Sequence, residues 1–215
     1  MDKNQILANL DEAVKSFDRQ GAARWAETAM ENEIDPTEAL GVLTGAIRQV
    51  GEGFASGERF LPDLVGAADA LQAAMPIIEE ELKERGVERK SEGTVVVGTV
   101  SGDIHNIGKS MLCTLLLADG FEVIDLGIDV PSSRFVEAVQ RHTADILAMS
   151  ALLTTTAQEQ RHVIEMLEEA GIRDTVKVMV GGGAINEEFA ESIGADGYDP
   201  TAPGGVALAR RLLEE

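Results

Sequence analysis

The sequence predicts an α/β protein in which a four-helix bundle over residues 1–90 precedes a doubly wound parallel sheet of five strands over residues 91–215. Three observations support this fold. Apolar residues recur at helical spacing through the first 85 residues. A polar segment, residues 86–93, then separates the two halves. Beyond it, short apolar runs alternate with amphipathic ones, which is the pattern of parallel strands joined by helices.

Each helix of the bundle has its own signal. Apolar residues recur at helical spacing from Ile6 to Phe17, and Gly21 is expected to end that helix before a second one over 22–30. Asp35 followed by proline predicts an N-cap with proline at the first helical position. Pro62 begins the fourth helix. Four amphipathic helices with short connections indicate a small bundle.

The second half alternates regularly. Strands are expected over 94–98, 121–126, 144–149, 176–180 and 197–198, and helices over 108–118, 132–141, 156–170, 187–193 and 204–213. This alternation fits a flavodoxin-like (Rossmann-like) domain with strand order 2-1-3-4-5.

Composition limits the functional classes. The formal net charge is −20, with −8 on residues 1–90 and −12 on residues 91–215, so we expect no nucleic-acid partner. Cys113 is the only cysteine, which excludes an intrachain disulfide and favours a reducing compartment. The N-terminus lacks a signal-peptide pattern, and no apolar run approaches about 20 residues. We therefore expect a soluble, cytoplasmic protein without a membrane partner.

Unusual residues gather where three of the predicted strands end. These loops are Gly102–Gly108, Ser150–Thr156 and Gly181–Gly183, and the strand order brings them to one edge of the sheet. Asp103 stands two residues before His105, and a carboxylate that orients an imidazole is the usual support of a metal-binding histidine. Glycines leave room for a bulky group, and hydroxyls supply hydrogen bonds. The loops together predict a large ligand with a metal at His105 and a tail between the sheet and a helix.

These residues resemble a known family. Asp103-x-His105-x-x-Gly108, Ser150-x-Leu152 and Gly181-Gly182 are similar to the cobalamin-binding signature, with 41 residues between the first two motifs and 28 between the last two. The string Gly51–Leu71 is typical of the helical cap of that family. The resemblance covers nearly the whole chain and is strongest to the corrinoid proteins of methyltransferase systems, which are related to the cobalamin module of methionine synthase.

The resemblance implies a cobalamin (as methylcobalamin and cob(I)alamin) or a related corrinoid as the cofactor. His105 would be the lower cobalt ligand in place of the cofactor's own benzimidazole, Asp103 would hydrogen-bond it, and Thr156 would complete a proton relay. The cofactor-binding residues that it carries over are Gly102, Asp103, Ile104, His105, Asn106, Ile107, Gly108, Ser150, Leu152, Thr154, Thr156, Gly181 and Gly182, with Phe54 and Leu61 covering the upper, methyl-bearing face.

The implied function is that of a methyl-carrying corrinoid subunit that is not a catalyst on its own. Its partners would be a substrate:corrinoid methyltransferase, a second methyltransferase whose acceptor is tetrahydrofolate or a thiol coenzyme, and a reductive activase. Two alternatives stay open: the cobalamin-binding subunit of an adenosylcobalamin-dependent mutase, and a cobalamin-dependent sensor or regulator. The cap-like string argues against the first, and the acidic charge against a DNA-binding form of the second.

Simpler interpretations apply to single motifs. The stretch Gly102–Ser110 ends like a phosphate loop, but five residues rather than four separate its glycines, and Asp103 would repel phosphate. The glycine run could be only a turn, the threonines an N-cap, and Phe54 and Leu61 bundle core. His142 and His162 are expected on the surface, and a zinc site is not expected with one cysteine and three histidines.

Overall fold

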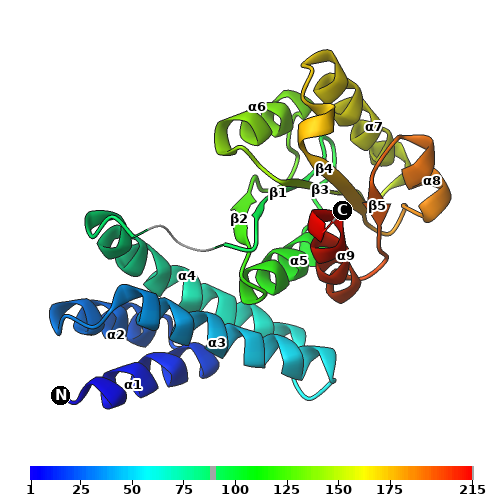
Figure 1. Cartoon of the computed structure of the whole chain (residues 1–215). Coiled ribbons are helices and arrows are strands. Elements are labelled where there is room, and N and C mark those ends of the chain that lie inside the picture. Colours follow the sequence, from blue (N-terminus) through cyan, green and yellow to red (C-terminus); the bar gives the residue numbers. More distant parts are fainter. Residues whose placement is uncertain (88–90, 215) are drawn as a thin grey trace. The chain divides into compact units, whose positions relative to one another are not determined.

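The computed structural model describes residues 1–87 and 91–214. It divides into two compact units: the first contains residues 1–90 together with Leu117–Asp119, and the second contains the rest of the chain. The first unit is helical, and the second is a parallel sheet with its helices (Figure 1). None of the helices within the described ranges combines the length and the apolarity that crossing a membrane requires.

The first unit contains α1 (Lys3–Lys15), α2 (Arg19–Glu31), α3 (Pro36–Ala55) and α4 (Leu61–Glu84). Asp35 caps α3 as expected, because its side chain accepts a hydrogen bond from Thr37 N at 2.9 Å. The packed interior includes large aliphatic side chains that are at most 1% exposed: Ile6, Leu10, Leu43, Ile47, Leu64, Leu71 and Ile78.

Gly21 does not end the first helix, so that expectation was wrong. The helix α1 ends at Lys15, and Phe17 makes the turn with a φ of 65°. Gly21 lies inside α2, where its N–H donates to the N-cap carboxylate of Asp18 at 2.9 Å. A Cβ at this position would meet the same carboxylate, so Gly21 packs against the N-cap of α2 and does not mark a helix end.

The second unit confirms the predicted fold. Its strands are β1 (Thr94–Thr99), β2 (Glu122–Asp125), β3 (Ile146–Ser150), β4 (Lys177–Gly181) and β5 (Gly197–Tyr198). They form one five-stranded sheet in the order β2-β1-β3-β4-β5, with every pair parallel. The helices are α5 (Ile107–Ala118), α6 (Ser132–His142), α7 (Thr154–Glu169), α8 (Glu187–Ser192) and α9 (Ala202–Glu214); a 3-10 turn, η1 (Arg173–Thr175), was not predicted.

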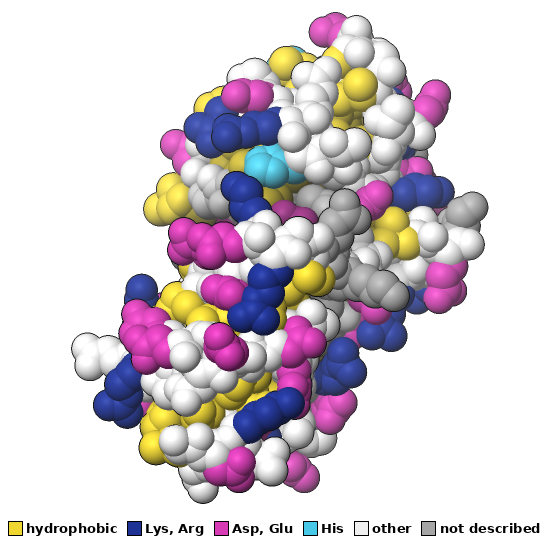
Figure 2. All heavy atoms as spheres, turned by 60° about the vertical axis from the view of Figure 1, so that its left-hand side comes forward, with side chains coloured by type: hydrophobic (Ala, Val, Ile, Leu, Met, Phe, Trp, Pro, Cys, Tyr) yellow, Lys and Arg dark blue, Asp and Glu magenta, His cyan; other side chains and the backbone are white. Residues whose placement is uncertain are grey.

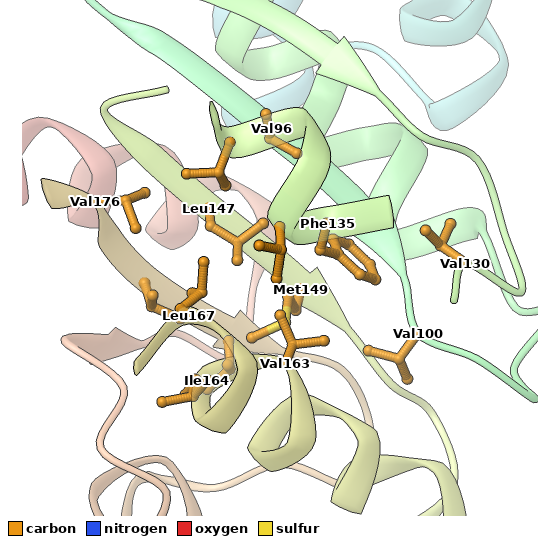
Figure 3. Close-up of a cluster of buried hydrophobic side chains, with 14 of the residues drawn as sticks. Val96, Val100, Val130, Phe135, Leu147, Met149, Val163, Ile164, Leu167 and Val176 are labelled. Carbon is orange, nitrogen blue, oxygen red and sulfur yellow. The ribbon is translucent and has the colours of Figure 1, made fainter. Parts of the chain in front are cut away.

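Helices cover both faces of the sheet because alternate strand side chains point in opposite directions. Val96 belongs to the core beneath α6 and α7, whereas Val95 and Val97 belong to the core beneath α5 and α9 (Figure 1). The first of these cores centres on Phe135, Leu147 and other apolar side chains drawn in Figure 3. The carboxyl ends of β1, β3 and β4 are therefore held between two packed layers.

Cys113 belongs to the core beneath α5 and α9. Burial, with a contribution from the nearby Asp125 carboxylate, raises the pKa of the Cys113 thiol to about 12. The thiol is therefore protonated at neutral pH and belongs to the packing.

Charged side chains of both signs are interleaved on the face of the molecule shown in Figure 2. Acidic groups stand beside basic ones, and this face shows no broad basic surface on the part of the chain that the structure describes.

Candidate functional site

Three loops meet at one edge of the sheet, because the strands that lead into them are in register. Thr99 at the end of β1 is paired with Ser150 of β3, which is paired with Gly181 of β4. The hydroxyl of Thr99 also donates to the main-chain oxygen of His105 at 3.1 Å, which ties the loop after β1 to its strand. The edge predicted from the strand order is therefore the place where the candidate residues lie.

Asp103 connects two of these loops through its two carboxylate oxygens. Oδ1 lies 2.7 Å from Nδ1 of His105 and accepts the His105 N–H at 3.0 Å. Oδ2 accepts from Leu152 N at 2.7 Å and from the Thr156 hydroxyl at 2.7 Å, with Leu153 N farther away at 3.4 Å. A single buried carboxylate thus holds the imidazole on one side and the start of α7 on the other.

The charge state of Asp103 determines which nitrogen of His105 is free. Burial alone would raise the pKa of Asp103, but the hydrogen bonds from His105 N, Thr156 and Leu152 N outweigh it, so the pKa lies well below its ordinary value. An ionised carboxylate only accepts hydrogen bonds, so Nδ1 of His105 must carry the proton and donate it. The neutral ring then has its lone pair on Nε2, and the His105 side chain is 49% exposed.

A cavity of about 650 Å³ opens beside His105, between the sheet and helices α5 and α9. The loop after β4 and the start of α9 line it together with the loops after β1 and β3. Nine of the predicted cofactor-binding residues line it: Ile104, His105, Asn106, Ile107, Gly108, Ser150, Leu152, Gly181 and Gly182.

Gly182 is required by the backbone geometry of its turn, independently of any ligand. Its φ is +118°, and a Cβ would collide with the carbonyl oxygen of Ala151 in the neighbouring loop. Gly183 is similarly close to the Leu152 side chain, where a Cβ would lie 2.7 Å from Cδ1. The glycine run therefore forms a tight turn and lines the cavity as well, so the two interpretations of this motif are compatible.

Other predicted residues lie outside the cavity lining. Asp103 and Thr156 stand behind the imidazole, and Gly102 donates its N–H to Asp129 at 2.7 Å. Thr154 is exposed at the first residue of α7, so its expected contact with a cofactor tail stays a prediction. Phe54 and Leu61 are half-buried in the first unit, and their expected place over the cofactor also stays a prediction.

The threonines after β3 are not an N-cap. The N-cap of α7 is Leu153, and no side chain caps this helix. The Thr156 hydroxyl instead lies 2.7 Å from Asp103 and 3.0 Å from the carbonyl of Leu153. His162 is exposed on α7, as expected, whereas His142 on α6 is half-buried.

Sequence reasoning missed the loop between β5 and α9, whose residues Asp199, Pro200 and Thr201 line the cavity together with Ala202 and Gly205 of α9. The strand-end rule that identified the other loops also applies to this one, but a two-residue strand gives a weak signal. The sequence also gave no sign that Lys109, whose side chain is 3% exposed, pairs with Asp125 at 2.5 Å.

Gln160 is a further residue that the sequence did not suggest. It is fully buried on α7, and its Nε2 donates to the carbonyl of Met149 at 3.0 Å and to that of Gly181 at 3.3 Å. Its Oε1 has no hydrogen-bond partner among the described residues. The amide thus links β3 to β4 at the edge where the cavity opens.

Comparison with known families gives the site its context. A family described as "B12 binding domain" matches residues 93–207, and a second family of the same description matches residues 6–79. The chain belongs to the B12-binding family. Its cofactor is therefore a cobalamin or a related corrinoid, as the motifs predicted.

Individual relatives match almost end to end. The chain is 44% identical over 212 residues to trimethylamine corrinoid protein 1 of Methanosarcina acetivorans, covering 98% of each chain. It is 43% identical to dimethylamine corrinoid protein 2 of the same organism, covering 98% of this chain and 97% of the relative.

Two similar solved structures are also of cobalamin-related proteins. A methanol:cobalamin methyltransferase complex from Methanosarcina barkeri contains a chain that is 30% identical with a TM-score of 0.86, covering 99% of this chain and 81% of that one. A cobalamin-binding protein from Desulfitobacterium hafniense is 32% identical with a TM-score of 0.64, covering 99% and 98%.

The residues of this B12-binding chain fit such a cofactor. Within residues 1–87 and 91–214, no group of three or more His, Cys, Asp or Glu side chains could hold a bare metal ion. A metal that brings its own macrocycle needs only an axial ligand from the protein, and His105 offers one accessible nitrogen beside a cavity.

Proposed function

We propose that this chain is the methyl-carrying corrinoid subunit of a methyltransferase system. In this proposal, Nε2 of His105 is the lower ligand of cobalt, and the displaced nucleotide tail of the cofactor occupies the cavity beside it. The observation that carries the proposal is the 2.7 Å contact between His105 Nδ1 and the ionised Asp103, because it leaves Nε2 as a lone-pair donor.

The names of the relatives support the carrier role. Two relatives above 40% identity are called trimethylamine and dimethylamine corrinoid proteins, and a third similar chain forms part of a methanol:cobalamin methyltransferase complex. We infer that the methyl donor is an N-methylated amine, delivered by a substrate:corrinoid methyltransferase. A second methyltransferase then passes the group to tetrahydrofolate or a thiol coenzyme, and a reductive activase restores the cofactor after accidental oxidation.

The residues of the chain would support the cofactor in a defined way. When bound, the corrin supplies a cobalt centre that accepts and releases a methyl group. Asp103 holds the His105 ring in place through the contact with Nδ1. The Thr156 hydroxyl and Leu152 N donate to Asp103 in turn, and these bonds keep the carboxylate fixed behind the His105 ring.

Electron paramagnetic resonance of the cob(II)alamin-loaded protein tests the ligand directly. Cobalt(II) bound to one nitrogen shows a splitting that depends on the nuclear spin of that nitrogen. We expect the splitting to change from triplet to doublet when the protein alone is labelled with ¹⁵N, because the ligand would be His105 and not the unlabelled benzimidazole.

His105→Ala provides the matched variant, and His162→Ala, on an exposed face of α7, is the control. With both variants labelled with ¹⁵N, we expect His105→Ala to lose the doublet while His162→Ala keeps it. A triplet in place of the doublet in the ¹⁵N-labelled wild-type protein, or a doublet that survives in ¹⁵N-labelled His105→Ala, would contradict the proposal.

A further inference from the structure

The inner end of the cavity is closed by four apolar residues. Ala148 of β3 and Met179 of β4 are paired in register, two residues before the edge formed by Ser150 and Gly181. Both belong to the core beneath α5 and α9. Leu112 from α5 and Gly205 from α9 complete this surface. We call these four residues, Leu112, Ala148, Met179 and Gly205, the cavity floor.

The floor is tightly packed at Gly205. A Cβ on this glycine would lie 3.0 Å from Cδ1 of Leu112 and 3.5 Å from Cε of Met179. Two side chains from different elements thus converge on one backbone position that carries no side chain. Any enlargement of residue 205 would press against Leu112 and make the cavity shallower.

The floor contains no polar side chain, and three polar side chains elsewhere in the cavity lining, Lys109, Asp199 and Thr201, already have hydrogen-bond partners. Lys109 Nζ lies 2.6 Å and 2.5 Å from the two oxygens of Asp125. Asp199 Oδ1 accepts from the backbone N–H of Thr201 at 2.8 Å and from its hydroxyl at 2.9 Å. The Thr201 hydroxyl also accepts from Gly204 N at 3.0 Å.

We infer that the cavity floor selects the base at the end of the corrinoid's nucleotide tail, favouring a flat, largely apolar base such as a benzimidazole over a purine such as adenine. This inference rests on the proposed function, which places the tail in the cavity. Adenine has an amino group and several ring nitrogens, and a floor without polar side chains leaves them without hydrogen bonds. Burying polar groups without partners is costly, so the two bases are discriminated.

Three ligands separate the contribution of the base from that of the corrin. Cobalamin ends in dimethylbenzimidazole, pseudocobalamin ends in adenine, and cobinamide has no nucleotide. We measure dissociation constants for all three by absorbance titration and calorimetry. The two bases bind cobalt with different strength in the free cofactors, and this difference alone affects the dissociation constants. The ratio of the pseudocobalamin to the cobalamin dissociation constant is therefore compared between wild type and variants.

Met179→Gln tests the polarity of the floor. It places an amide of similar length beside the base. We expect this substitution to reduce the ratio of pseudocobalamin to cobalamin dissociation constants by about tenfold relative to wild type. An unchanged ratio in a folded Met179→Gln protein would overturn the inference.

Gly205→Val tests the depth of the floor, and Ala207→Val, at an exposed position of the same helix, is its control. We expect Gly205→Val to weaken cobalamin binding at least tenfold and to leave cobinamide binding unchanged. Equal weakening of cobinamide would overturn the inference, as would full cobalamin affinity. Gly205→Ala, a smaller change in the same direction, replaces the valine variant if that variant does not fold.

The nitrogen splitting of the cob(II)alamin-loaded protein distinguishes the two failures. If a protein nitrogen binds cobalt but neither floor variant changes the base preference, the inference about the cavity floor is wrong and the proposed function stands. If the benzimidazole nitrogen stays on cobalt, the tail never enters the cavity, and both proposals fail.

Discussion

Asp103 shows how one side chain can determine the state of another. Its carboxylate accepts hydrogen bonds from two loops, and these bonds keep it ionised despite its burial. An ionised acceptor requires a proton on Nδ1 of His105, and this requirement fixes the tautomer of the ring. The accessible nitrogen of His105 is thus a consequence of contacts made some 50 residues away in the sequence, at Leu152 and Thr156.

Asp103→Asn should destabilise the cofactor-free protein by about 2 to 3 kcal/mol at pH 7, because an amide offers one acceptor oxygen where the carboxylate offers two. Because the pKa of Asp103 is lower in the folded state than in the unfolded state, its ionised carboxylate stabilises the fold above about pH 4. This stabilisation is lost as the pH falls and the carboxylate becomes protonated. The difference in unfolding free energy between wild type and variant should therefore be constant from pH 7 to 5 and shrink below pH 4. Urea unfolding at pH 7, 5 and 3.5 measures it, and a difference independent of pH would refute the assignment.

Sequence reasoning at the residue scale found the pair Asp103 and His105 because their spacing is local. It placed Thr156 near them only through a family resemblance, since its contact with Asp103 spans 53 residues and depends on the register of β1 and β3. The role of Gln160 gave no signal, because a glutamine inside a helical pattern resembles any surface residue until the fold buries it.

At the scale of elements, the turn after β4 is defined by its contact with the turn after β3. Gly182 occupies a backbone conformation that side chains rarely adopt, directly against the carbonyl oxygen of Ala151. The two turns fit together only because this position has no side chain. The shape of the cavity rim therefore depends on the close contact between Gly182 and Ala151.

Gly182→Ala should reduce the unfolding free energy by about 2 to 4 kcal/mol, since it adds backbone strain and a steric collision. Gly108→Ala is the matched control: it lies on the same rim, in the first turn of α5, and its Cβ would meet nothing within 4 Å. We expect the control to change stability by less than about 1 kcal/mol, in the stabilising direction. Denaturant unfolding of both cofactor-free variants tests this, and equal losses would rule out the steric explanation.

The sequence predicted most elements because their signals are local, such as the Asp35 cap and the alternation of strands with helices. It misplaced the end of α1 because a phenylalanine, Phe17, makes the turn that a glycine usually makes. Phe17 is held there by packing: a Cβ on Gly66 would lie 2.9 Å from its side chain, and the Arg59 guanidinium stacks 5.8 Å from its ring centre. Such tertiary support leaves no local pattern in the sequence.

At the scale of the whole molecule, every residue that lines the cavity belongs to the second unit. The two matched family regions likewise divide the chain, at residues 6–79 and 93–207. We propose that residues 91–215 form an independent cofactor-binding domain and residues 1–90 a separate helical domain.

A fragment of residues 91–215 should therefore unfold cooperatively and bind cob(II)alamin with the same protein-nitrogen splitting as the full chain. A fragment of residues 1–90 should remain helical and show no such splitting. Circular dichroism, urea unfolding and electron paramagnetic resonance of both fragments provide the measurements. A non-cooperative 91–215 fragment would argue that the second unit needs the first in order to fold.

Cys113, the single cysteine of the chain, can be used to measure how often the second unit opens. Cys113 lies on α5 and packs against the sheet, and its thiol keeps its proton far above neutral pH, so a thiol-reactive dye can modify it only when this layer opens. Labelling rates measured without denaturant would give the frequency of that opening, with no engineered probe. Repeating the measurement with corrinoid present would reveal how much the bound tail slows the separation of α5 from the sheet.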